Sequence, residues 1–308
     1  MSAGWAVVFF FALLAAGGVV SLLGAAAIQK VLGVVFDRMA AKEQPPGRPH
    51  RPGSGALESQ MKALARPTLL LLPTEAPAFS KLGGAPDLGD GATWPTSTVT
   101  HRFPRREVTT PMGFVAQLDL AEVRAAGGPD WLPNQGRLYF FAEPWMGAVV
   151  HDPMPDDAQP RIAVPASPKG FPLAERQVVM SPAISYPDLE WMVDDLHEPE
   201  MDEEVLERLA EFPAAHMPSP EHRIGGHASA IQGLNMEFEC EQMLATLEGR
   251  EPTLTRPSES DWRLLLQVDT DADLKAQWGD GGRLYYWIRE ADARDGDFSK
   301  IQMIGQSY

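Results

Sequence analysis

Four aspartates lie close together near the C-terminus and could supply ligands to a metal ion. Asp269, Asp271, Asp273 and Asp280 stand at positions 1, 3, 5 and 12 of a twelve-residue segment, the spacing of carboxylates in an EF-hand calcium loop. Position 6 of that loop requires glycine, however, and Leu274 stands there. The segment therefore predicts either a calcium site of another type or side chains that close turns.

A Gln-x-Asp pattern occurs twice, as Gln117 with Asp119 and as Gln267 with Asp269. In each case the pattern ends a run with the alternation of a β-strand, so glutamine and aspartate share one strand face. One interpretation is a polar recognition site where two related halves of the protein meet. The alternative is a pair of buried amides that bond to the backbone of neighbouring segments, as buried polar groups commonly do.

The usual sequence signatures of catalysis are missing from this chain. It contains no Gly-x-Ser-x-Gly elbow, no P-loop, no His-Glu-x-x-His and no dinucleotide fingerprint. Cys240 is the single cysteine, and we expect it to fill core space as a small apolar group. These features favour a non-catalytic binding protein, with no cofactor, over a metal-dependent or acid–base enzyme that would use the acidic segment 269–280.

Three sequence blocks recur in the same order in two halves of the chain. Lys81–Pro86 corresponds to Arg223–Ala228, the two Gln-x-Asp patterns follow, and Gly136–Phe141 corresponds to Gly282–Trp287. The ordered recurrence predicts an internally duplicated domain over residues 67–308. We place its halves at about 67–170 and 220–308, with an acidic helical connector at 171–219.

The recurring blocks are typical of strands, and helical signal is sparse. Residues 114–120 alternate in polarity, and each Gly-Arg-Leu-Tyr block is a turn glycine followed by an aromatic strand. The clearest helical stripe is at 199–212, within the connector. Because strands and helices do not alternate regularly, we predict an α+β fold with a mainly antiparallel sheet and few helices.

The first 28 residues predict an extracytoplasmic stub followed by one transmembrane helix. Residues 5–28 carry no charge and are long enough, as a helix, to span a bilayer. Residues 29–66 follow as a basic tether rich in proline and glycine, which places the C-terminal domain in the cytoplasm of a single-pass cell-membrane protein. Gly17, Ser21 and Ala25 recur at every fourth position, a spacing that permits a dimer through this helix.

Charge is distributed unevenly along the 308 residues, whose formal net charge is −16. Residues 53–308 hold 21 of the 26 basic and 40 of the 42 acidic side chains, a net charge of −19. Proteins that bind nucleic acid need clustered Lys and Arg, so we exclude that class of partner. The acidic body instead favours a basic protein partner through long-range attraction.

Several motifs together resemble the YwqG-like family of uncharacterised bacterial proteins (DUF1963). The motifs that carry the resemblance are Ser80–Pro86, Trp94–Pro95, Gln117-x-Asp119, His222–Gly226, Leu264–Asp271, Trp278–Gly282 and Asp297–Ser299. The resemblance covers roughly residues 67–306 and implies a duplicated α+β fold. It implies no activity, and it suggests a partner-binding or immunity-like role. His227 departs from the pattern, because an aromatic residue is expected there.

Overall fold

The computed structural model describes residues 59, 61–102, 105–143, 146–158, 160–166, 170–188, 217–232, 235–253 and 260–308. These residues belong to one compact unit, Pro52–Tyr308. Within the described residues, no helix has the length and apolar character needed to cross a membrane. The predicted transmembrane helix at residues 5–28 and the predicted connector helix at 199–212 lie outside them.

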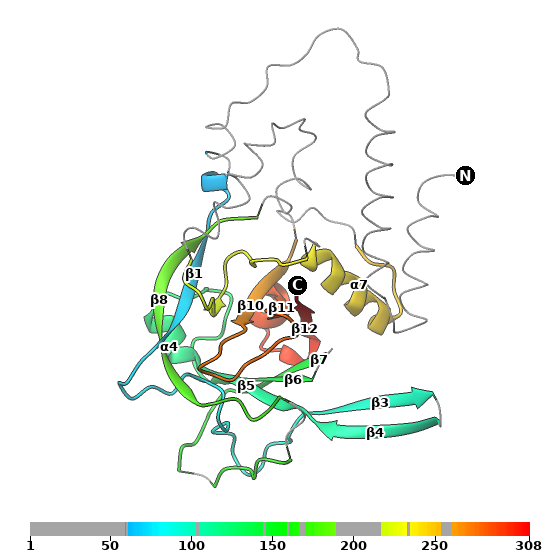
Figure 1. The fold of residues 1–308 in the computed structure, drawn as a ribbon. Coiled ribbons are helices and arrows are strands. Elements are labelled where there is room, and N and C mark those ends of the chain that lie inside the picture. Colours follow the sequence, from blue (N-terminus) through cyan, green and yellow to red (C-terminus); the bar gives the residue numbers. More distant parts are fainter. Residues whose placement is uncertain are drawn as a thin grey trace, which may run out of the picture. The chain divides into compact units, whose positions relative to one another are not determined.

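Ten strands form one large sheet, and two more form a separate hairpin (Figure 1). Neighbouring strands are antiparallel throughout the described part of the sheet, in the order β12-β11-β10-β9-β1-β8-β2-β5-β6-β7. The strands of the sheet are β1 (Arg66–Pro73), β2 (Lys81–Leu82), β5 (Gly113–Asp119), β6 (Arg137–Glu143), β7 (Met146–Asp152), β8 (Arg176–Ser185), β9 (Arg223–Ile224), β10 (Trp262–Asp269), β11 (Arg283–Arg289) and β12 (Gln302–Gln306). The hairpin consists of β3 (Thr96–Arg102) and β4 (Arg105–Pro111).

The centre of the sheet is the long ladder between β1 and β8. Its register runs from Arg66 opposite Ser185 to Pro73 opposite Val178. On its other edge β1 pairs with β9, and β8 pairs with β2. β1 of the N-terminal part therefore lies beside β9 of the C-terminal part. The segment 171–219 is predicted as a helical connector, but its residues 176–185 form β8, a central strand of the sheet.

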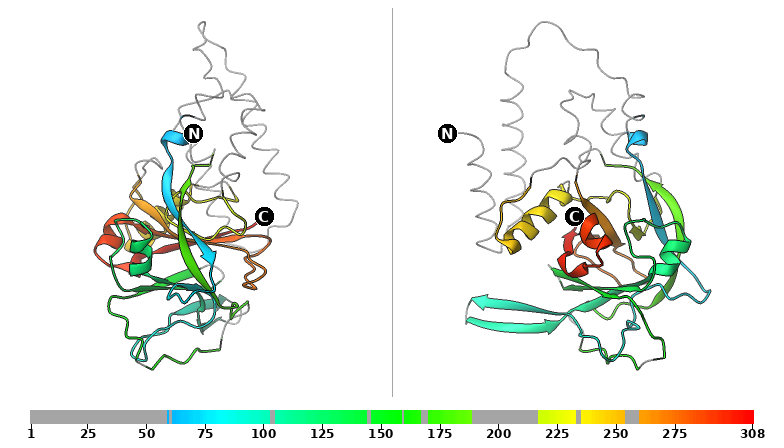
Figure 2. Two further views of the ribbon diagram at one scale, coloured as in Figure 1. Left: turned by 90° about the vertical axis from the view of Figure 1, so that its left-hand side faces the viewer. Right: turned by 180° about the vertical axis from the view of Figure 1, so that it is seen from behind.

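The two edge strands of the large sheet, β7 and β12, meet because the sheet is strongly curved (Figures 1 and 2). Tyr286 of β11 donates a hydrogen bond from its hydroxyl to the carbonyl oxygen of Phe141 in β6, at 3.1 Å. Gly147 of β7 lies so close to β12 that a Cβ atom there would come within 2.6 Å of Cβ of Met303. The curved sheet encloses the main hydrophobic core, which draws side chains from both parts of the chain.

The strand predicted at 114–120 is confirmed as β5, but every one of its residues is buried. The reason is that the outer face of the sheet is covered as well. A second hydrophobic cluster that includes Leu88, Met112 and Phe114 covers β5 and β6. The helix α7 (Met236–Glu248) contributes Cys240 to a third cluster over β10 and β11, which confirms the core position expected for that residue.

The remaining helices are short and lie at the ends of strands. They are α4 (Leu120–Ala125), α8 (Glu290–Arg294) and the 3₁₀ helix η3 (Phe298–Lys300). The aspartate that ends β5, Asp119, caps α4 by accepting hydrogen bonds from the backbone of Ala121 and Glu122. The described part of the chain is thus mostly antiparallel sheet with few helices, as the fold-class prediction stated.

We predict that Gly147→Ala destabilises the domain by about 1–3 kcal/mol, because its Cβ atom would push β7 away from β12. Chemical unfolding followed by tryptophan fluorescence measures this change. Gly91→Ala is the matched control, since nothing lies within 4 Å of a Cβ atom there. Equal free energies of unfolding for the two variants would contradict close contact between the edges of the sheet.

Candidate functional site

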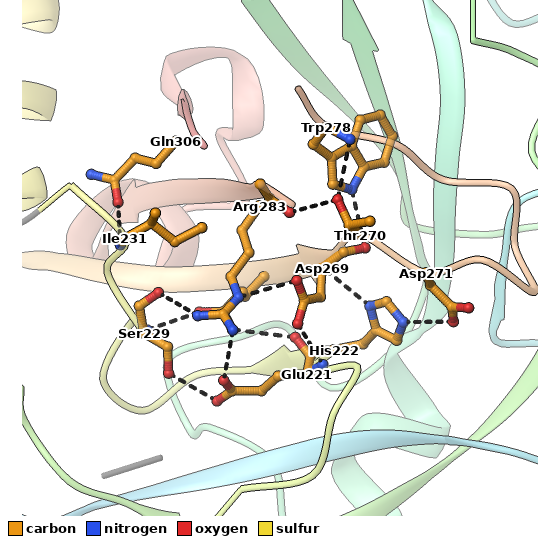
Figure 3. Close-up of polar contacts among 12 residues, drawn as sticks. Glu221, His222, Ser229, Ile231, Asp269, Thr270, Asp271, Trp278, Arg283 and Gln306 are labelled. Carbon is orange, nitrogen blue, oxygen red and sulfur yellow. Dashed lines mark hydrogen bonds and ion pairs between the residues drawn. The ribbon is translucent and has the colours of Figure 1, made fainter. Parts of the chain in front are cut away.

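Asp269, the last residue of β10, lies at the centre of a buried polar network (Figure 3). One carboxylate oxygen is 3.2 Å from Nε of Arg283, and the other accepts a hydrogen bond from the backbone N–H of Glu221 at 3.0 Å. The aspartate is only 7% exposed. Each of its oxygens therefore has a partner within the protein.

His222 connects Asp269 to Asp271. Its Nδ1 accepts a hydrogen bond from the backbone N–H of Asp269 at 3.1 Å, so the proton resides on Nε2, which lies 3.2 Å from the Asp271 carboxylate. Burial lowers the pKa of His222, although the neighbouring Asp271 acts in the opposite direction. At neutral pH the imidazole is therefore uncharged and serves as a fixed hydrogen-bond bridge.

Asp271 is engaged from three sides. Arg176 of β8 reaches it with one guanidinium nitrogen at 3.0 Å and reaches Asp273 with another at 3.0 Å. The other Asp271 oxygen accepts from the backbone N–H of Asp273 and of Leu274, which closes a turn. Burial raises the pKa of Asp271, but the hydrogen bonds from His222 and the turn outweigh it, and the net pKa is lowered.

A second buried ion pair adjoins Asp269. Arg223 of β9 lies 2.6 Å from a carboxylate oxygen of Glu221, and both side chains are almost fully buried. Ser229 links them, because Arg223 donates to its hydroxyl and the hydroxyl donates to Glu221. Arg283 completes the group by donating to the carbonyl oxygen of Ser229 at 2.9 Å.

The two predicted glutamines occupy matching positions but do not contact each other. Gln117 donates to the carbonyl oxygen of Phe79 and accepts from the backbone N–H of Asp87. Gln267 donates to the carbonyl oxygen of Glu221 and accepts from the backbone N–H of Ser229. Four strands separate β5 from β10 in the sheet. Both amides bond to backbone in the way that the alternative interpretation predicts.

The polar contacts of Asp119 repeat those of Asp269 in the other part of the chain. Nε of Arg137 lies 3.2 Å from the Asp119 carboxylate, as Nε of Arg283 does from Asp269. Tyr139 donates its hydroxyl to the carbonyl oxygen of Asp87, and Tyr285 donates its own to that of Ser229. The arginines follow the turn glycines of the recurring blocks, a signal that was visible in the sequence but was not assigned to the site.

This geometry bears directly on the four aspartates considered as metal ligands. Asp269 and Asp271 are bound by cationic side chains, Asp273 pairs with Arg176, and Asp280 is exposed. Within the described ranges, no group of three or more His, Cys, Asp or Glu is arranged to hold a metal ion. As arranged, the network fixes strand ends and turns, and a calcium site at 269–280 stays a prediction.

A pocket of about 530 Å³ lies where the central ladder meets loops from both parts of the chain, and none of the charged residues of the network lines it. That volume lies within the range of small-molecule sites. Its walls are formed by Arg66–Leu69 of β1, Pro182–Ile184 of β8, Gly127–Trp131, Gly225, Gly226, Arg263 and Leu264. We call it the junction pocket. Sequence reasoning missed it, because its lining residues are dispersed over 199 positions of the chain.

Gly225 gives the junction pocket one open corner, whereas a Cβ atom on Gly226 would come within 2.3 Å of Oγ of Ser185. Both have positive φ angles, 70° and 78°, which favour glycine. A Cβ atom on Gly225 would meet nothing closer than 3.3 Å. At the corresponding Gly83, in contrast, a Cβ atom would come within 2.1 Å of the carbonyl oxygen of Ala174. Among the described residues, the loop that fills the first glycine corner thus has no counterpart at Gly225.

His227 borders this corner and is buried against the backbone. Its Nε2 lies 2.7 Å from the carbonyl oxygen of Leu64, and the backbone N–H of His227 donates to the hydroxyl of Ser185. Burial, together with the nearby Arg66, lowers the pKa of His227 to about 3. The histidine that departs from the family pattern is therefore a neutral packing residue at ordinary pH.

The network and the pocket define a domain with buried ion pairs and an open cavity. Comparison with protein families places residues 80–306 in the family described as a domain of unknown function (DUF1963). The chain belongs to this family, as the resemblance of its motifs indicated. None of the curated proteins matches the chain.

We predict that Asp269→Asn lowers the free energy of unfolding by about 3 kcal/mol, because Arg283 would lose its buried counter-charge. Asp280→Asn is the control and should change stability by less than about 0.5 kcal/mol, since the side chain is exposed. Denaturant unfolding with and without calcium measures both effects. Equal losses in the two variants that appear only with calcium would instead favour a metal site.

Proposed function

We propose that this protein is a membrane-anchored, non-catalytic binding module that holds its ligand or partner in the junction pocket. The observation that carries the proposal is the open pocket that β1, β8 and loops from both parts of the chain form together. A cavity with a few polar groups at its rim is the usual form of a binding site.

We also infer an internal duplication, which would support this proposal. The matching contacts of Gln117 and Gln267, and of Asp119 and Asp269, are what two copies of one ancestral unit would retain. Duplicated units commonly place a binding site where they meet. Loss of one filling loop at that junction, at the corner of Gly225, would convert a packed corner into a site.

The state of the charged groups supports a non-catalytic role. A general base or nucleophile needs a free lone pair near a cavity. His222 uses both ring nitrogens within the network, and the Asp269 and Asp271 carboxylates accept from cations and backbone N–H groups. Such groups hold the fold and leave recognition to the walls of the pocket.

The walls of the junction pocket combine apolar and cationic surface. Trp131, 8% exposed, and Leu264 supply apolar area. Arg66 and Arg263 lie at the same pocket, and Arg263 is held by Glu290 at 2.9 Å. A ligand or peptide side chain with an apolar body and an acidic or polar end fits this chemistry.

We predict that Ala183→Trp, which would fill the junction pocket, abolishes the rise in melting temperature caused by a binding ligand. The measurement is a thermal-shift screen of metabolites and of basic and acidic peptides. Ala125→Trp is the matched control, because it adds the same side chain at a different pocket of about 300 Å³. A screen without any shift, or a shift that survives Ala183→Trp, would refute the proposed site.

Membrane attachment in this proposal rests on the uncharged run 5–28 and the basic residues that follow it. We predict that a reporter enzyme active only outside the cytoplasm stays inactive when fused after Arg51. A cytoplasmic reporter fused at the same residue is the control and should be active in the membrane fraction. The opposite pattern would show that the C-terminal domain lies outside the cytoplasm. Reporter activity in the soluble fraction would contradict the membrane anchor.

A further inference from the structure

A second pocket, of about 320 Å³, lies where the end of β6, the start of β11 and the end of β12 meet the loops at 170–171 and 277–279. We call it the aromatic pocket, because Phe171 and Trp278 both lie in its walls. None of the residues that line it also lines the junction pocket. A ligand of the aromatic pocket would therefore bind independently of a ligand in the junction pocket.

The two aromatic rings of this pocket are fixed in place by the protein. Phe171 and Trp278 contact each other, with ring centroids 6.1 Å apart and ring planes inclined by 46°. The indole N–H of Trp278 donates to the carbonyl oxygen of Asp269 at 3.1 Å, and its backbone N–H donates to the hydroxyl of Thr270 (Figure 3). The ring of Phe171 covers Gly113, where a Cβ atom would come within 2.3 Å of it. A ligand would therefore meet rings that are already ordered, which lowers the entropic cost of binding.

Glu143, the last residue of β6, gives the aromatic pocket a negative charge. The side chain is partly buried, and one carboxylate oxygen accepts a hydrogen bond from the hydroxyl of Thr110 at 2.9 Å. Within the described part of the chain, no cationic side chain pairs with this carboxylate. Arg283 lines the same pocket, but its charge is balanced by Asp269 at 3.2 Å. The charge that remains without a counter-charge at this pocket is therefore that of Glu143.

We propose that the aromatic pocket binds an organic cation, an ammonium group on a short alkyl stem. The faces of Phe171 and Trp278 attract the positive charge, and Glu143 supplies the counter-charge. The alkyl stem packs against the same rings and against Leu284. A free alkylamine and the lysine side chain of a basic partner both offer this chemistry. The net charge of −19 on residues 53–308 attracts either of them from a distance.

The two pockets select ligands of different charge. The junction pocket presents Arg66 and Arg263, whereas the aromatic pocket presents Glu143 beside aromatic faces. The proposed cation therefore belongs to the aromatic pocket and not to the junction pocket. Because the two sites share no lining residue, either proposal can fail while the other holds.

The test is saturation-transfer NMR on the full-length protein with three probes. These are n-butylammonium, a short lysine-containing peptide, and the same peptide with its lysine Nζ acetylated. We expect at least one of the two charged probes to bind, and the acetylated peptide to bind more weakly than its charged form. Tighter binding of the lysine peptide than of butylammonium would identify a protein side chain as the source of the cation, and the reverse would identify a free amine.

Two substitutions assign the binding to this pocket. Glu143→Gln removes the charge but keeps an oxygen that can accept from Thr110, and we expect it to weaken binding of the cation about tenfold. Phe171→Leu keeps an apolar side chain but removes the aromatic face, and we expect a loss of about threefold.

Glu107→Gln is the matched control for charge. Glu107 is exposed on the β3–β4 arm and does not line the pocket, and its substitution changes the net charge by the same amount as Glu143→Gln. We expect Glu107→Gln to leave binding unchanged, because salt screens an exposed charge. Melting temperatures of the variants show whether each one is folded. No binding of either charged probe, equal binding of the acetylated and charged peptides, or equal effects of the two glutamine substitutions would overturn the proposed site.

Discussion

The ladder between β1 and β8 is the constraint on which the rest of the structure depends. It joins strands that are more than one hundred residues apart in the chain. It also connects the two ends of the sheet, because β9 pairs with β1 on one side of the ladder and β2 pairs with β8 on the other. From one edge the strands follow as β7-β6-β5-β2, and from the other edge they follow as β12-β11-β10-β9. Corresponding strands of the two parts therefore occupy equivalent places in the sheet. If β8, which lies before the predicted second half at 220–308, is counted as the first strand of that half, each unit of the proposed duplication gives its first strand to the sheet of the other. Neither unit could then bury its core alone.

Charged side chains are buried at the ends of several strands, where they pair with one another. Arg176 at the start of β8 meets Asp271, which follows β10, and Asp269 meets Arg283 of β11. Removing one member of such a pair leaves the other charged and desolvated, which costs far more than the pair contributes. The charged side chains of the network therefore keep these partners in the folded protein.

The local elements could be predicted from the sequence, whereas their partners could not. Polarity alternation and turn glycines identify β5, β6, β10 and β11 because they are properties of neighbouring residues. The bonding of Gln117 and Gln267 to backbone follows from the general rule for buried amides. The ion pair of Arg176 with Asp271 joins residues 95 positions apart, and no spacing rule connects them. The junction pocket depends on the same long-range pairing and was invisible for the same reason.

The two parts of the chain differ most in what lies between matching strands. Between β9 and β10 the chain forms α7, which packs on the outer face of its own sheet through Cys240 and Leu244. Between β2 and β5 the chain instead forms the β3–β4 arm, which extends away from the body. The insertion between β9 and β10 therefore enlarges the hydrophobic core, whereas no side chain of β3 or β4 belongs to a hydrophobic cluster of the described residues.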